Sequence, residues 1–161
     1  MLRVVNLTPI FIAKTAGLKE TIHDKNRPHG IVTINVNGLT FAIPLRTNLS
    51  HNYGVVLDTI VKDGRSLKRG LDFTKALIIT DESEDIGVSY KVPDTQKAVL
   101  NDQKKMIINQ FHKYVDGYIS AVSRNVTKTL SSNAYKYSTL CNYHSELGIA
   151  PQQAAVEQPD T

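Results

Sequence analysis

The sequence predicts an α+β domain in which strands come first and helices follow. Two runs of alternating apolar residues lie within 30–43, whereas the apolar spacing over 102–122 is that of a helix. Because the two kinds of element are segregated along the chain, we expect a strongly bent antiparallel sheet or small β-barrel core with peripheral α-helices. A length of 161 residues and a hydrophobic content of 41% suit one domain with a single core.

A β-hairpin over residues 30–43 is the clearest local prediction. Asn37-Gly38 separates the two alternating runs and favours a two-residue turn, because both turn positions need a positive φ. That turn fixes the pairs across the hairpin and puts all their apolar side chains on one face of the sheet. The predicted pairs are Val32 with Ile43, Ile34 with Phe41, and Val36 with Leu39.

Shorter patterns predict the other elements of the first half. Strands are expected over 2–5, 55–61 and 73–80, a helix over 9–16, a turn over 62–65, and polar loops over 17–29 and 44–53.

The second half is expected to be helical. The main helix covers 102–122 with Asn101 or Asp102 as its N-cap, and a second amphipathic stretch covers 135–147 and ends at Gly148. Residues 1–148 are therefore expected to form one domain, followed by a disordered tail over 149–161.

Charge is distributed unevenly along the chain. Residues 1–80 hold eleven basic and five acidic side chains, and residues 81–161 hold eight and ten, for a net charge of +4. The basic excess favours a polyanionic partner for the first half. The single cysteine, Cys141, excludes an intramolecular disulfide and a multi-cysteine zinc site. With no secretory signal or membrane-spanning pattern, we expect a cytoplasmic protein without membrane contact.

Two polar loops flank the hairpin and concentrate the side chains that carry chemistry. The first contains His23, Lys25, Asn26, Arg27 and His29, and the second contains Arg46, Thr47, Asn48, Ser50, His51, Asn52 and Tyr53. Because a two-residue turn brings the far ends of a hairpin together, we expect Arg27 and His29 to lie near residues 44–47. The two loops would then form one cationic, hydrogen-bonding site.

Such a site suits cleavage of RNA by its own 2′-hydroxyl without a metal ion. This reaction needs a group that takes or orients the hydroxyl proton, cations for the charge developing on phosphorus, and a proton donor for the leaving oxygen. Arginine supplies a permanent forked charge, and histidine exchanges protons near neutral pH. A solvated loop has the same composition, so the residues alone leave both interpretations open.

Other polar clusters also have two interpretations. Lys62, Arg65, Lys68, Arg69 and Lys75 could follow a nucleic-acid backbone or form an ordinary soluble surface. The acidic run 81–85 could hold a divalent ion, as in a metal-dependent nuclease, although a solvated turn is the simpler interpretation. The tyrosines within 135–143 could pack in the core or stack on bases. His112 and His144 lie on amphipathic stretches, where packing or exposure is expected rather than metal ligation.

Several segments resemble the toxins of type III toxin–antitoxin systems, the ToxN/AbiQ group, and within it the TenpN-like branch. The resemblance covers roughly residues 1–123. The segments are Arg27-Pro28-His29-Gly30-Ile31-Val32, the Asn37-Gly38 hairpin, Phe41-Ala42-Ile43-Pro44-Leu45-Arg46-Thr47-Asn48, His51, Leu71-Asp72-Phe73-Thr74-Lys75-Ala76-Leu77-Ile78 and the helix after Asn101.

This resemblance implies a barrel-like antiparallel core and a sequence-selective endoribonuclease that uses no metal or cofactor and leaves a 2′,3′-cyclic phosphate. It also implies an antitoxin partner, a small repeat RNA that is often a pseudoknot. The toxin processes this RNA and binds it in a closed protein–RNA hetero-oligomer. The family acts in phage defence by abortive infection, so cellular or phage RNA would be the substrate. The alternative from another class is a non-enzymatic RNA-binding module, which explains the basic first half equally well.

Position by position, the family's active-site hydroxyl falls on Thr47, and the basic residue ahead of the hairpin falls on Arg27. The family's aromatic hydroxyl falls near His23. Many members carry Pro and then Lys after the hydroxyl, whereas this chain has Asn48 and Leu49.

The resulting hypothesis assigns a role to each group. Thr47 orients the 2′-hydroxyl or the phosphate, Arg27 and Arg46 stabilise the phosphorane, and Arg46 replaces the missing lysine charge. A histidine moves protons. The candidates for proton transfer are His51, His29 and His23, and the predicted RNA contacts are Lys25, Asn26, Asn48, Ser50, Asn52, Tyr53, Lys62, Arg65, Lys68, Arg69 and Lys75.

Overall fold

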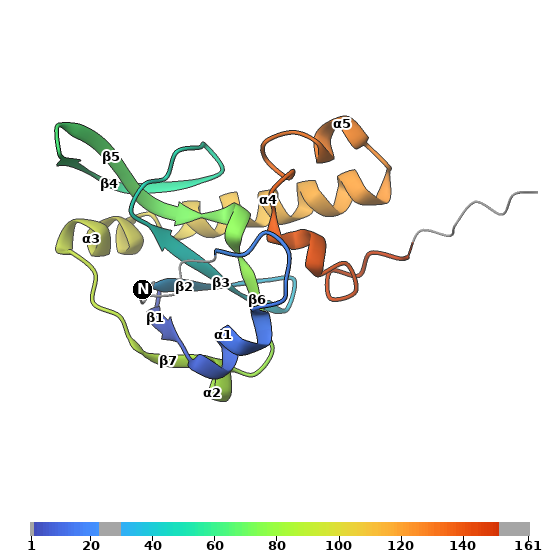
Figure 1. Ribbon diagram of the computed structural model, residues 1–161, viewed down its shortest axis with the longest axis horizontal. Coiled ribbons are helices and arrows are strands. Elements are labelled where there is room, and N and C mark those ends of the chain that lie inside the picture. The colour runs from blue at the N-terminus through green and yellow to red at the C-terminus, as the bar shows by residue number, and fades with distance from the viewer. Residues whose placement is uncertain (1, 23–29, 152–161) are drawn as a thin grey trace, which may run out of the picture.

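A 7-stranded antiparallel sheet forms the centre of the computed structural model, which describes residues 2–22 and 30–151 (Figure 1). Its strands are β1 (Val4–Leu7), β2 (Ile31–Val36), β3 (Leu39–Arg46), β4 (Gly54–Lys62), β5 (Arg65–Asp72), β6 (Leu77–Ile79) and β7 (Ile86–Ser89). They follow the order β4-β5-β3-β2-β1-β7, and β6 also pairs with β3. The α+β class and the antiparallel sheet are therefore confirmed. The barrel prediction is wrong, because β4 and β7 end the sheet without pairing with each other.

Helices lie on both faces of this sheet (Figure 1). They are α1 (Pro9–Thr15), α2 (Glu82–Asp85), α3 (Asp94–Asp102), α4 (Lys104–Ser123) and α5 (Thr127–Leu130), with short 3-10 turns η1 (Phe73–Lys75) and η2 (Thr139–Asn142). Within the described ranges, no helix combines the length and apolar character needed to cross a membrane.

The predicted hairpin is confirmed in turn and register. β2 and β3 pair as Val32 with Ile43, Ile34 with Phe41, and Val36 with Leu39. Asn37 and Gly38 have φ values of 53° and 78°, as a two-residue turn requires. The apolar face of the hairpin packs against α4, where Phe111 meets Phe41 edge-on with 5.1 Å between the ring centroids.

The opposite face of the sheet has a smaller core of its own. Phe11 from α1 packs there against Val5, Ile31, Ala42 and Ile79. Thr8 caps α1, since its side chain accepts a hydrogen bond from the Phe11 N–H. The central strands are therefore covered by α4 on one face and by α1 on the other.

The outer edge of β3 carries two different strands in succession. Its first half pairs with β6, through Thr40 and Ile79, and its end pairs with β5, through Arg46 and Gly70. The chain connects these two strands through η1, so the predicted continuous strand over 73–80 is wrong. β5 itself was not predicted, because its polar residues hide the strand pattern.

Three corrections concern the second half of the chain. Helix α4 buries the predicted face that includes Ile107, Phe111 and Tyr118, but it starts at Lys104 after a separate helix, α3, and has no side-chain N-cap. The stretch 135–147 is not a helix but a chain of turns around η2. Its buried hydroxyls bind backbone groups instead: Ser138 caps η2, and Thr139 donates to the Ala76 carbonyl. Ile149, predicted to begin the tail, is buried in the core.

β4 and β5 form a hairpin that projects from the sheet at the upper left of Figure 1. A bulge between Val56 and Asp58 shifts the register. Val55 and Leu57 are buried and Val56 between them is exposed, as the alternation of a strand requires. The strands approach closely beside this bulge. A Cβ atom on Gly70 would lie 2.1 Å from the Val55 carbonyl oxygen, so only glycine fits there.

The acidic run 81–85 is structural and forms α2. Asp81 caps this helix by accepting from the Ser83 and Glu84 N–H groups. The fully buried Asp85 carboxylate accepts from the N–H groups of Thr80 and Asp81 and lies 2.9 Å from the Lys14 ammonium. Burial acts to raise the pKa of Asp85, but these hydrogen bonds and Lys14 outweigh it and hold the pKa below its usual value.

Gly70→Ala is expected to destabilise the protein by about 2 kcal/mol or more, because the added methyl group collides with backbone rather than with a movable side chain. Urea unfolding measures the loss. Gly17→Ala is the matched control, since a Cβ there meets nothing within 4 Å. Equal unfolding midpoints for the two variants would contradict the close approach of β4 and β5.

Asp85→Asn is expected to flatten the acid side of the stability curve. A carboxyl whose folded pKa lies below its unfolded value stabilises the fold above about pH 4, and this contribution disappears as the pH falls through the folded pKa. Thermal unfolding between pH 2 and pH 6 measures the slope. The exposed Asp63→Asn variant should keep the parent slope, and a parent slope in Asp85→Asn would count against the Asp85 assignment.

Candidate functional site

A buried carboxylate, Asp72, organises the polar residues at the junction of β5 and η1. Its Oδ1 accepts from the Thr74 N–H at 3.0 Å and from the Thr74 hydroxyl at 2.6 Å, which caps η1. His51 Nε2 lies 3.1 Å from Oδ1, and Arg46 Nε lies 4.0 Å from Oδ2. The side chain of Asp72 is 3% exposed, so its charge is stabilised by these neighbours rather than by bulk water.

Arg46 is the last residue of β3 and not part of a loop, as the prediction for 44–53 had it. Its backbone pairs with Gly70, and its side chain is one-third exposed beside Asp72. A guanidinium held on one side by a carboxylate keeps further N–H groups for a second anion. Arg46 is therefore both anchored and accessible.

Backbone hydrogen bonds tie the loop over 47–53 to β5 near its start and to η1 at its end. The Leu49 N–H donates to the Lys68 carbonyl at 2.7 Å, and the Phe73 N–H donates to the Tyr53 carbonyl at 3.1 Å. Leu49 is buried, which explains an apolar residue in a polar loop. The exposed predicted residues of this loop are Thr47, Asn48, Ser50 and Asn52.

The hydrogen bonds of His51 fix its tautomer. The Tyr53 N–H donates to Nδ1 at 3.0 Å, so the neutral ring carries its proton on Nε2, which faces Asp72. The ring also stacks on Tyr53 with 5.6 Å between centroids. Both nitrogens are thus engaged, and an exchange of protons with a substrate would first break one of these contacts.

Two of the predicted RNA contacts have partners inside the protein. Lys75 donates to the carbonyls of Glu20 and Tyr137, and burial lowers the pKa of its ammonium, with Arg46 adding to the effect. Arg69 forms a two-bond pair with Asp58, at 2.7 and 2.5 Å, which holds the pKa of that carboxyl below its usual value. These side chains position η1 and the β4–β5 hairpin rather than extending into solvent.

The other predicted cations of this region are exposed. Lys62, Arg65 and Lys68 lie on the projecting β4–β5 hairpin and have no ion pair with any residue that the structure describes. The remaining predicted residues, His23, Lys25, Asn26, Arg27 and His29, lie outside the described residues. Gly30, which follows them in the sequence, accepts a hydrogen bond from the Leu45 N–H next to Arg46.

Comparisons with protein-family models, with curated proteins and with solved structures give no match. The candidate site therefore stands on its geometry.

A cationic groove of about 250 Å³ was missed by the sequence analysis. Arg3, Lys91 and Lys97 line it, from segments far apart in the chain, together with Tyr90 and one carboxylate, Asp94. The Tyr90 ring packs on Gly30, where a Cβ would lie 2.5 Å from Cδ1. The sequence did not indicate that these cations lie close together, because this depends on the positions of β7 and α3, which were not predicted.

Asp72 was also missed as a site residue, although a signal was present. It is the one carboxylate in the otherwise apolar run Leu71-Asp72-Phe73, and a hydroxyl follows two residues later. A charged residue in such a run is costly unless partners surround it, so its partners were worth seeking nearby.

Asp72→Asn is expected to lower stability by about 1–3 kcal/mol, because the amide keeps the cap on η1 but leaves Arg46 and His51 without their anion. Hydrogen exchange at the Leu49 and Tyr53 amides should also become faster. The control Asp63→Asn makes the same change in an exposed turn with φ 52°, which asparagine tolerates. Unchanged unfolding and exchange in Asp72→Asn would show that Asp72 does not organise the loop.

Proposed function

We propose that this chain is a metal-independent endoribonuclease, the toxin of a type III toxin–antitoxin system. The observation that supports this most is the cluster at the end of β3. A buried carboxylate lies 4.0 Å from the one-third exposed Arg46 side chain, and the exposed Thr47 follows directly in the sequence. In the proposed reaction this cation and this hydroxyl contact the same phosphodiester group.

Each group has a role in the attack of the 2′-hydroxyl on phosphorus. Arg46 binds the non-bridging oxygens, whose negative charge grows in the transition state, and Asp72 keeps its guanidinium in place. Thr47 hydrogen-bonds the 2′-hydroxyl or the phosphate and orients the attack. Arg27 contributes the second cation.

Both ring nitrogens of His51 have partners within the protein, which favours a positioning role for this residue. Its ring joins Tyr53 to Asp72 and so fixes the loop that follows Thr47. Proton transfer is accordingly assigned to His29 or His23, which precede Gly30 in the sequence. The proposal keeps the RNA partner implied by the family resemblance: a small repeat antitoxin RNA in a closed assembly, with cellular or phage RNA as substrate.

A non-enzymatic RNA-binding module is the second candidate. The unpaired cations Lys62, Arg65 and Lys68 on the projecting hairpin favour it, because phosphate contacts of this kind bind RNA without chemistry. A binding module does not, however, explain why a buried carboxylate, Asp72, lies beside Arg46.

The purified chain is expected to cut a long RNA in EDTA at discrete positions, leaving 2′,3′-cyclic phosphate ends. Thr47→Ala, Arg46→Gln and Arg27→Ala should each lower the cleavage rate by about 100-fold or more. Lys113→Gln removes a charge from the exposed side of α4 and should cleave at the parent rate. Primer extension and end-group analysis give the positions and the product.

The outcomes separate the candidates. RNA retardation without cleavage would support the binding module, and cleavage that EDTA abolishes would indicate a metal-dependent nuclease. Parent-like rates in all three variants would place the active site elsewhere.

A further inference from the structure

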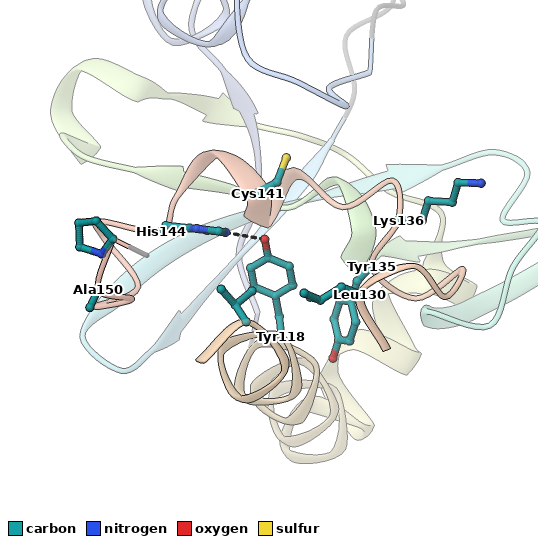
Figure 2. Close-up of a pocket in the computed structure, with 9 residues that line it drawn as sticks. Tyr118, Leu130, Tyr135, Lys136, Cys141, His144 and Ala150 are labelled. Atoms are coloured by element: carbon teal, nitrogen blue, oxygen red, sulfur yellow. Dashed lines mark hydrogen bonds between the residues drawn. The ribbon is translucent and has the colours of Figure 1, made fainter. Parts of the chain in front are cut away.

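A larger cavity lies between the end of α4 and the C-terminal turns (Figure 2). Its volume is about 510 Å³, and its wall is mostly aromatic and aliphatic, from Tyr118, Val122, Leu130 and Tyr135. Lys136, Cys141 and His144 supply the polar part of the lining. None of its lining residues takes part in the proposed cleavage chemistry.

The aromatic wall is rigid because polar contacts fix its rings. The Tyr118 hydroxyl lies 2.7 Å from His144 Nε2, as the dashed line in Figure 2 shows. Burial raises the pKa of Tyr118 to about 12, so the hydroxyl keeps its proton at neutral pH and can donate to or accept from the ring nitrogen. The Tyr135 hydroxyl donates to the Tyr114 carbonyl and fits over Gly117, where a Cβ would lie 2.4 Å from it. A rigid wall costs little entropy when a ligand binds.

Lys136 supplies the formal charge in the lining of this cavity, which includes no aspartate or glutamate among the described residues. A carboxylate does lie nearby, since burial and the charge of Glu20 both raise the pKa of the Cys141 thiol. The Lys136 ammonium lies 5.2 Å from the ring centroid of Tyr137, which is half exposed. An apolar cavity edged by one lysine and by aromatic rings suits a ligand with a flat apolar body and a neighbouring negative charge.

The cavity is connected to the proposed cleavage site through one side chain. Lys75 donates to the Tyr137 carbonyl, and the charges of Asp72 and Cys141 both influence the pKa of this lysine. Thr139 also donates to the Thr74 and Ala76 carbonyls, which fastens the C-terminal turns to η1. These contacts fix the position of the C-terminal turns relative to η1.

We propose that this cavity is a nucleobase subsite for single-stranded RNA, with the base against the partly exposed Tyr135 ring and a neighbouring phosphate at Lys136. RNA as the ligand rests on the proposed function, but binding at this subsite does not require cleavage. The subsite gives the region after residue 123 a role in holding a base outside the reacting phosphodiester.

Cys141 provides a direct probe, because it is the single cysteine, is exposed and lines the cavity. The experiment measures its alkylation rate by iodoacetamide while a 2′-O-methyl RNA hexamer is titrated. This probe lacks the attacking hydroxyl, so it stays intact whether or not the protein cleaves RNA. An abasic hexamer with the same phosphates is the matched ligand control.

The hexamer is expected to slow alkylation, and the abasic hexamer should need about tenfold higher concentration for the same protection, which corresponds to one stacked base. Lys136→Glu should raise the half-protecting concentration of the 2′-O-methyl hexamer about tenfold. Lys105→Glu, about 20 Å away along α4 from Tyr118, should leave it unchanged.

Absence of protection, or equal protection by the two hexamers, would overturn the subsite. Protection by a protein that does not cleave RNA would overturn the proposed function and leave the subsite standing. Cleavage without protection of Cys141 would overturn the subsite and leave the proposed function standing.

Discussion

One buried negative charge holds the polar end of this fold together. Asp72 lies at the point where β5 leaves the edge of β3 and the chain turns through η1 into β6. A carboxylate that is 2% exposed is costly unless cations and hydrogen-bond donors surround it. Thr74, His51 and Arg46 meet that requirement. Asp72 therefore accounts both for the turn η1 between β5 and β6 and for the position of Arg46.

The turn η1, which Asp72 caps, also positions the C-terminal region. η1 places Lys75 beside Asp72, and Lys75 in turn binds the Tyr137 carbonyl at 2.8 Å. Thr139 completes the connection by donating to the carbonyls of Thr74 and Ala76. The turns around η2 and the cavity behind them therefore depend on the conformation of η1, although 65 residues separate Thr74 from Thr139 in sequence.

Local sequence patterns predicted the structure correctly where a residue pair or spacing is compatible with one conformation. Asn37-Gly38 admits a tight turn, and the alternation around it fixes the register of β2 and β3. The buried stripe of α4 was likewise readable from its spacing. Over 135–147 the spacing was misleading, because Ser138 and Thr139 are buried with backbone partners that no helix would provide. β5 was not predicted because its first half is exposed and cationic and lacks an apolar alternation. Only its last residues, Gly70 to Asp72, are buried.

The candidate site was predictable in part. The sequence indicated Arg46, Thr47 and His51, because arginine, hydroxyl and imidazole groups gather there in few residues. It did not indicate that His51 is engaged at both nitrogens or that Lys75 and Arg69 have partners, since these facts depend on Asp72, Tyr137 and Asp58 across strand pairings. The cavity lined by Tyr118 and His144 joins segments that only the tertiary fold brings together.

A double-mutant cycle on RNA cleavage in EDTA tests most directly whether Asp72 acts by holding Arg46 in place. Rates are measured for the parent, Asp72→Asn, Arg46→Gln and the double variant. If the carboxylate works through the arginine, the double variant cleaves at about the rate of Arg46→Gln alone, because no further interaction remains to be lost. Fully additive losses, or a parent protein that leaves RNA uncut, would contradict this account.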